Sequence, residues 1–147
     1  MTDGDRGRSL ADSLSKLKEA LKDDADRRTE HADEDTISSE YARAHAHANV
    51  EIARRNLEQD PTNPMLRDWL AFNLYASGRY DEASVLYQQC LSRDDKNADQ
   101  HYYLGNCFYK LGDFRQAVDH WQRVVELEPR SKVAEKAVGK LDKVRLR

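Results

Sequence analysis

The side chains of this sequence that are best suited to chemistry are its five histidines and two cysteines. His45 and His47 are two residues apart, which on a helix separates them by about 200°, so one metal ion cannot reach both. Cys90 and Cys107 form no Cys-x-x-Cys pair, and no second cluster accompanies them. We therefore expect neither a zinc site nor a disulfide framework, and we interpret both cysteines as buried small apolar side chains.

The sequence contains no recognisable catalytic constellation. His120 has neither a nucleophile nor a paired acid near it along the chain. A glycine-rich phosphate loop, a Ser-His-Asp order and a paired-carboxylate motif are also missing from the sequence. We therefore expect no enzyme activity, no cofactor and no metal.

The composition favours an all-α fold. Charged residues make up 35% of the 147 residues, while proline occurs 3 times and glycine 6 times, which disfavours turn-dense β architecture. The formal net charge of −3 gives no general attraction to phosphate backbones, and no apolar run approaches the ~18 residues needed to cross a bilayer. The first residues also lack the apolar stretch of a signal peptide. We expect a cytoplasmic protein that binds neither nucleic acid nor membranes.

An internal repeat organises the second half of the chain. Gly78 and Gly112 are 34 residues apart (112 − 78), and each is followed two places later by an aromatic residue, Tyr80 or Phe114. A period of this length is typical of helix pairs that stack in series as an α-solenoid. Other pairs that preserve size class at this offset are Leu70 with Leu104, Ala71 with Gly105, Ala83 with Ala117, Tyr87 with Trp121 and Leu91 with Val125.

Capping residues share the same spacing. Asn63, Asn97 and Ser131 are each 34 apart and can accept hydrogen bonds from the free N–H groups of a starting helix. Apolar residues recur with a helical period after each cap, and Gly78 or Gly112 stands where the first helix must end in a left-handed conformation. Each unit, 64–97 and 98–131, is therefore predicted to be a pair of helices.

Residues 64–131 resemble two consecutive tetratricopeptide repeats. The second unit carries the family pattern more fully, whereas the first has Ala71, Leu74, Arg79 and Asp95 where the family favours glycine, an aromatic, an acid and proline. The resemblance implies a TPR-like α-solenoid of antiparallel helix pairs that binds other proteins. The pattern residues of the second unit are Leu104, Gly105, Phe108, Gly112, Asp113, Phe114, Ala117, Trp121 and Pro129.

The flanking segments extend the predicted array. We expect one long helix at 38–59 and a C-terminal capping helix at 132–146, so that the repeat domain spans 38–147. Residues 1–37 are predicted to be a flexible charged segment, in which leucines at helical spacing indicate a short amphipathic helix at 10–22.

The resemblance also implies which residues line a concave groove. In the family, fixed positions of the first helices face this groove, and here several of them are aromatic or basic. The alternative is that the aromatics are buried beneath the long or the closing helix, and that the lysines only solvate a cap. The predicted peptide-binding residues are Phe72, Tyr75, Tyr102, Asn106, Tyr109, Lys110, Lys136 and Lys140.

Three functions remain open at this point. The first is an adaptor whose groove captures an apolar and acidic peptide segment of another protein. The second is a self-associating structural protein, with the helix at 10–22 docked in its own or a neighbour's groove, and the third is a client-holding chaperone. Binding of acidic chaperone tails is disfavoured, because Asp68 and Asp99 stand at groove positions where a ligand carboxylate would be repelled.

Overall fold

The computed structural model describes residues 16–19 and 40–145. Within these residues every regular element is a helix and no strand occurs, which confirms the expected all-α fold. Two compact units divide the chain, Met1–Arg43 and Ala44–Arg147. The helices are α2 (Glu40–Gln59), α3 (Pro64–Ala76), α4 (Tyr80–Arg93), α5 (Ala98–Lys110), α6 (Phe114–Leu127) and α7 (Lys132–Arg145).

The boundary between the two units falls inside α2, whereas the sequence analysis placed a domain boundary between residues 37 and 38. Of the amphipathic helix predicted at 10–22, only residues 16–19 are described, and these are helical. The remainder of that helix, and the rest of the segment 1–37, lie outside the described residues.

Side-chain caps fix where the first helix of each repeat begins, and where α7 begins. The Asn63 side chain accepts a hydrogen bond from Met65 N at 3.0 Å, and the Asn97 side chain accepts one from Gln100 N at 3.1 Å. Ser131 Oγ accepts from the backbone nitrogen three residues later, also at 3.1 Å. These bonds satisfy N–H groups that have no partner within the helix, and they confirm the caps predicted at 34-residue spacing.

The two glycine turns have the same conformation. Gly78 and Gly112 both have φ of 85°, the left-handed region that glycine enters without a Cβ penalty. In the first turn Arg79 N donates to Leu74 O at 2.8 Å, and the second turn repeats this bond between the equivalent residues. This pattern closes the end of a helix by satisfying its last carbonyl groups. The chain therefore reverses direction in the same way in both repeats.

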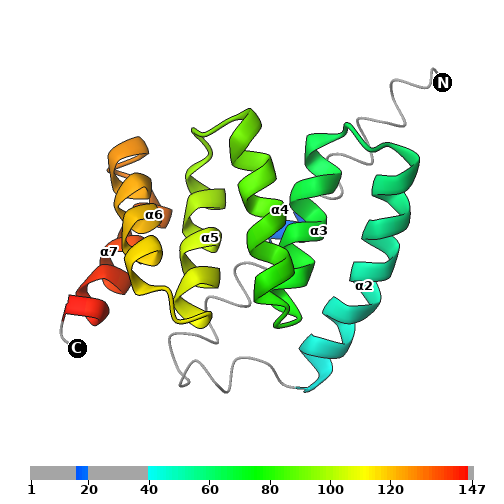
Figure 1. The fold of residues 1–147 in the computed structure, drawn as a ribbon, viewed down its shortest axis with the longest axis horizontal. Coiled ribbons are helices and arrows are strands. Elements are labelled where there is room, and N and C mark those ends of the chain that lie inside the picture. The colour runs from blue at the N-terminus through cyan, green and yellow to red at the C-terminus, as the bar shows by residue number, and fades with distance from the viewer. Residues whose placement is uncertain (1–15, 20–39, 146–147) are drawn as a thin grey trace. The chain divides into compact units, whose positions relative to one another are not determined.

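The helices stand side by side in chain order, and each runs opposite to the one before (Figure 1). From α3 onward each helix contacts the next, and in addition α3 contacts α5 and α5 contacts α7. The first helices of successive units thus form an inner layer, α3–α5–α7. This serial packing of helix pairs is the architecture of an α-solenoid.

α5 and α6 approach each other closely at Gly105 in the second repeat. A Cβ atom at this position would lie 2.6 Å from Trp121 Nε1 and 3.2 Å from the carbonyl oxygen of Ala117. Trp121 is 1% exposed, so its indole cannot move aside into solvent. The lack of a side chain at residue 105 therefore allows α6 to pack against α5 through a large aromatic ring.

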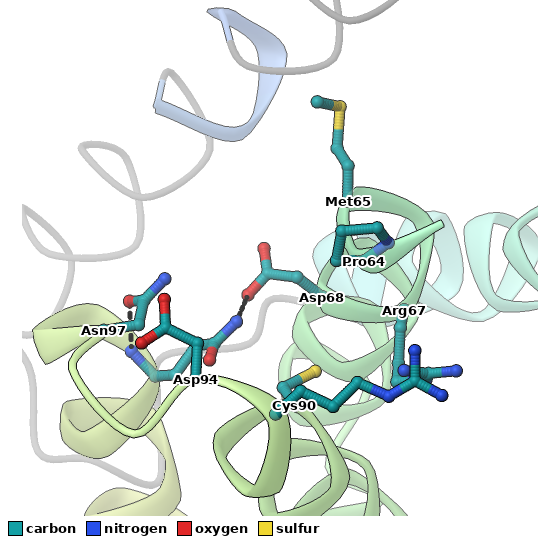
Figure 2. A pocket seen from close by; sticks show the side chains of 9 residues that line it. Pro64, Met65, Arg67, Asp68, Cys90, Asp94 and Asn97 are labelled. Atoms are coloured by element: carbon teal, nitrogen blue, oxygen red, sulfur yellow. Dashed lines mark hydrogen bonds between the residues drawn. The ribbon is translucent and has the colours of Figure 1, made fainter. Parts of the chain in front are cut away.

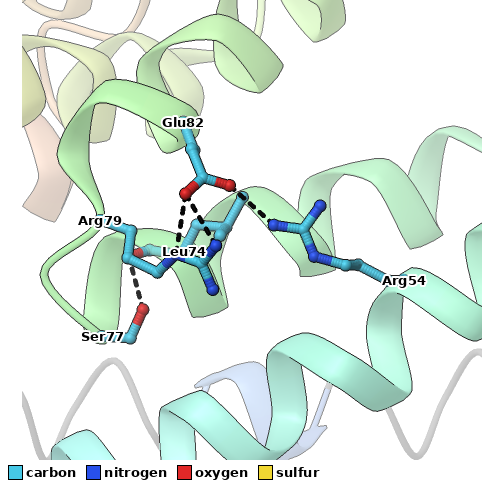
Figure 3. A network of polar contacts seen from close by, with 5 residues as sticks. All are labelled: Arg54, Leu74, Ser77, Arg79 and Glu82. Atoms are coloured by element: carbon cyan, nitrogen blue, oxygen red, sulfur yellow. Dashed lines mark hydrogen bonds and ion pairs between the residues drawn. The ribbon is translucent and has the colours of Figure 1, made fainter.

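An ion-pair network joins α2 to the first repeat (Figure 3). Arg54 Nη2 lies 2.7 Å from Glu82 Oε2, and Arg79 Nη2 lies 2.7 Å from Glu82 Oε1. Partial burial alone would raise the pKa of Glu82, but the hydrogen bonds from Arg54 and Arg79 outweigh it and hold the pKa below its ordinary value of 4.5. The charged carboxylate is therefore the form that the folded state favours.

We expect Gly105→Ala to lower the free energy of unfolding by about 1–3 kcal/mol, because the new methyl group overlaps Trp121. The matched control is Gly139→Ala on α7. An added Cβ there meets nothing within 4 Å in the described part of the chain. That change should raise stability by up to about 1 kcal/mol through helix propensity. Urea denaturation measures both changes, and equal effects at the two positions would contradict the close approach.

The low pKa of Glu82 predicts a loss of stability in acid. Because the folded-state pKa lies below the unfolded value, its contribution is present above the unfolded pKa and is lost as the pH falls through the folded one. We expect the urea midpoint to drop less between pH 6 and pH 3 for Glu82→Gln than for the wild type. Asp81→Asn, which removes an exposed carboxylate from the same turn, should leave the drop unchanged.

Candidate peptide-binding surface

The candidate binding surface is the inner layer, α3–α5–α7, because the predicted binding residues all lie on these three helices. The structure places them at different depths. Phe72, Tyr102 and Asn106 are buried, Tyr75, Tyr109, Lys136 and Lys140 are half-buried, and Lys110 is exposed.

An aromatic cluster occupies the space between α3 and α5. Its central ring is Tyr103, whose centroid lies 5.1 Å from that of Tyr75 and 5.5 Å from that of Phe72. Tyr102 lies 5.3 Å away and Tyr87, from α4, lies 6.2 Å away. Edge-to-face and stacked contacts of this kind stabilise a core beyond the area that they bury. Phe72 therefore serves the contact between α3 and α5, which differs from the burial beneath the long or the closing helix that the sequence analysis gave as the alternative.

Tyr103 is the part of this cluster that sequence reasoning missed. A usable signal existed, because residue 103 is 34 positions after Trp69 (103 − 69), and both are large aromatic residues. Both side chains are buried, so the repeat alone could have placed Tyr103 in the core.

Asn106 links the two repeats through hydrogen bonds. Its Nδ2 donates to the hydroxyl oxygen of Tyr75 at 3.2 Å, and its Oδ1 accepts from Trp121 Nε1 at 3.1 Å. Burial raises the pKa of the Tyr75 phenol well above its usual value, which keeps this ring neutral. Asn106 therefore holds two aromatic side chains in position, and its amide is committed within the fold.

Tyr109 and the lysines extend the surface toward α7. The ring of Tyr109 packs against Phe114 at 5.4 Å and against Trp121 at 5.8 Å between centroids. Lys110 follows it at the end of α5, and Lys136 lies on α7, which contacts α5. This end of the inner layer therefore combines an aromatic ring with cationic side chains.

The two repeats differ in a buried polar atom. In the second repeat Trp121 Nε1 donates to Asn106, whereas the equivalent aromatic of the first repeat has an unsatisfied hydroxyl in the described part of the chain. Tyr87 takes the place of Trp121 (121 − 34), but Phe72 takes the place of Asn106 (106 − 34). Among the described residues Tyr87 Oη, which is fully buried, has no hydrogen-bond partner. The first repeat therefore has no side-chain amide at the position of Asn106, and its buried hydroxyl is unsatisfied within the described ranges.

An open pocket of about 270 Å³ lies where the start of α3, the end of α4 and the start of α5 meet (Figure 2). One wall is fixed by a hydrogen bond from Gln100 Nε2 to Asp68 Oδ1 at 3.0 Å. The lining mixes cationic and anionic side chains, so it favours no single ligand charge. The residues that line it are Pro64, Met65, Arg67, Asp68, Cys90, Arg93, Asp94, Asn97 and Gln100.

The described residues offer little for metal or thiol chemistry. Residues 16–19 and 40–145 contain no group of three or more histidine, cysteine or acidic side chains that could hold a metal ion. Cys90 and Cys107 are buried and form no disulfide bond, and burial raises the pKa of the Cys107 thiol, which leaves it unreactive. None of the described helices combines the length and apolar character that a bilayer crossing requires.

Comparison with known families decides the identity of the repeat. A family model for the tetratricopeptide repeat matches residues 98–131, and a second TPR repeat model matches residues 73–112. Residues 73–131 of this chain therefore consist of tetratricopeptide repeats. Members of this family are helical scaffolds for protein–protein interaction, and that general role applies to this chain.

Relatives of this tetratricopeptide-repeat chain share the repeats with it. Tetratricopeptide repeat protein 1 of Schizosaccharomyces pombe is 36% identical over 67 residues, which are 45% of this chain and 6% of that protein. The TPR repeat-containing thioredoxin TTL4 of Arabidopsis thaliana is 36% identical over 56 residues, which are 38% of this chain and 8% of that protein. The matched segments thus span less than a tenth of either relative.

A solved structure shares the tetratricopeptide-repeat fold. The structure of MamA AMB-1 superposes with a TM-score of 0.55 at 19% identity, over 94% of this chain and 80% of the other. At this level of identity the likeness shows the fold alone.

We expect Tyr87→Phe to leave the protein equally stable or to raise its free energy of unfolding by about 1 kcal/mol, because it removes a buried hydroxyl that lacks a partner. Tyr75→Phe is the matched control. It deletes the same atom where Asn106 donates to it, and should cost about 1 kcal/mol. Thermal and urea unfolding of both variants test this difference, and a larger loss for Tyr87→Phe than for Tyr75→Phe would contradict it.

Proposed function

We propose that this chain is a non-catalytic adaptor whose inner helical layer binds a peptide segment of another protein. The observation that carries the proposal is the contact of α3 with α5 and of α5 with α7, which joins the first helices into one continuous surface. A single peptide can cross such a surface and contact more than one repeat.

The predicted binding residues differ in how deeply they are buried, and we assign them different roles accordingly. Tyr75, Tyr109 and the three lysines retain accessible surface, so we propose that they contact the peptide. The buried side chains, Phe72, Tyr102 and Asn106, hold these contact residues in place rather than binding directly. Rigid aromatic rings supply apolar contact area at low entropic cost.

We propose that the bound segment carries acidic as well as apolar side chains. Lys110, Lys136 and Lys140 supply positive charge at the α5–α7 end of the surface. Complementary charge accelerates association and selects among partners more than it raises the final affinity. Asp68, at the α3 end, lies beside the pocket, so an acidic segment is expected to bind nearer to α7.

We also propose that the protein acts in the cytoplasm. Neither Cys90 nor Cys107 forms a disulfide bond. Reduced cysteines are the ordinary state in that compartment. This inference is independent of the peptide, because neither cysteine is among the proposed contact residues.

Selection from a random peptide display library followed by binding kinetics tests the proposal. We expect the enriched peptides to combine acidic and apolar residues. For a synthetic peptide of that kind, Lys136→Glu with Lys140→Glu should slow association by about tenfold or more at low salt, and the effect should shrink as salt is added.

The matched control carries Arg115→Glu and Arg123→Glu on α6, which changes the net charge by the same amount. It should bind the peptide like the wild type. Enriched peptides without acidic residues, or equal slowing in both double variants, would show that the α7 lysines do not select the ligand.

A further inference from the structure

The second helix of a repeat covers one particular face of the first helix. In the second repeat α6 packs on α5, and Trp121 lies against Gly105. The residue before it, His120, reaches two further positions of α5. Its Nδ1 lies 3.0 Å from Nδ1 of His101, and its ring stacks on Phe108 with centroids 5.6 Å apart. The face that α6 covers therefore includes residues 101, 105 and 108, which follow the helical spacing i, i+4 and i+7.

The equivalent face of α7 is open. The repeat offset of 34 residues (139 − 105) leads from the covered face of α5 to four exposed residues of α7, which are Glu135, Val138, Gly139 and Asp142. Val138 is 44% exposed, whereas its equivalent on α5, Leu104, is 1% exposed. A Cβ atom added at Gly139 would meet no described atom within 4 Å. The opposite side of α7 contacts α5 and α6, so α7 is placed as the first helix of a third unit.

The charges on this open face define what can cover it. Glu135 and Asp142 stand at the positions of the two α5 residues that His120 contacts. A side chain in the place of His120 on a covering helix would therefore lie between two carboxylates. Arginine and lysine are favoured there, because hydrogen bonds between ionised partners are the strong ones.

The shape of the open face adds two further requirements. Since Gly139 has no side chain, a large aromatic ring fits over it as Trp121 fits over Gly105. In α6 the residue four positions before this ring is Ala117, which is fully buried. Its carbonyl oxygen would lie 3.2 Å from a Cβ atom at residue 105, so the two helix backbones are close at this point. A covering helix therefore also needs a small residue four positions before its aromatic ring.

We propose that this face of α7 binds an amphipathic helix of another protein, which completes a third repeat. The helix carries a small residue, two variable positions, arginine or lysine, and then a large aromatic residue. Grooves that accept an amphipathic helix recognise side chains at such helical spacing. None of the four exposed α7 residues is among the proposed peptide contacts, so this site is additional to the surface of the inner layer.

The sequence indicates why the occupant is not a second copy of this chain. Tyr80 is its only aromatic residue that directly follows an arginine or lysine. The preceding Arg79 is already paired with Glu82 at 2.7 Å. The required combination of a basic and an aromatic side chain must therefore come from a different protein.

Synthetic peptides based on α6 test the site, because α6 covers the equivalent face of α5. Two fluorescent probes carry the sequence Phe114–Leu127, one with His120→Arg and the other with His120→Asp. Each is cross-linked on its solvent side, since isolated helices of this length are marginal in water. By fluorescence anisotropy at low salt, we expect the full-length protein to bind the arginine probe about tenfold or more tightly than the aspartate probe. Glu135→Lys with Asp142→Lys should reverse this preference.

Gly139→Gln tests the fit of the ring without changing the charge. The new side chain fills the space over residue 139 and should weaken binding of the arginine probe by about tenfold or more. Ala48→Gln, at an exposed position of α2, is its control and should bind like the wild type. The control for the charge reversal is Glu51→Lys with Glu58→Lys, two exposed α2 residues with the same separation (58 − 51 and 142 − 135). This variant should still prefer the arginine probe.

Equal affinity of the wild type for the two probes, or undiminished binding by Gly139→Gln, would overturn the proposal. Sedimentation equilibrium tests the choice of occupant, and we expect the same mass for the wild type and Gly139→Gln. A wild-type dimer that Gly139→Gln converts to a monomer would show that a second copy covers this face instead. Circular dichroism verifies that each variant is folded.

Discussion

The packing of Trp121 against Gly105 is the contact on which the second repeat depends. The indole occupies the space where any side chain at residue 105 would lie, and this sets the distance between α5 and α6. The same ring donates its N–H to Asn106, so the close approach also fixes the direction of a polar group. Steric fit and hydrogen bonding therefore reinforce each other at one position.

The first repeat solves the same packing problem with different side chains. Ala71 and Tyr87 stand at the positions of Gly105 and Trp121, and both are fully buried. Without an amide at position 72, the polar end of Tyr87 has no partner among the described residues. Two units with one backbone geometry thus differ in how completely their polar atoms are satisfied, which makes them unequal in stability as well as in sequence.

The sequence predicted those features that depend on local chemistry. The Asn63 and Asn97 caps and the left-handed glycine turns all appear as expected, because each is set by residues within a few positions of one another. Features that depend on side chains meeting across helices were not predicted. The pairing of Arg54 with Glu82 spans 28 residues and that of His101 with His120 spans 19, so no periodic pattern encodes them. How deeply each inner-layer side chain is buried also depends on packing across helices. The pattern of repeat positions in the family does not specify this packing.

The chain of bonds from Trp121 through Asn106 to Tyr75 crosses from one repeat into the other. In a solenoid, each repeat contacts only its neighbours, and cooperativity depends on how strongly adjacent units are coupled. A buried amide that serves both units raises this coupling, because neither can loosen without leaving the other with an unsatisfied group. We therefore expect the two repeats to unfold together as one block, not one after the other.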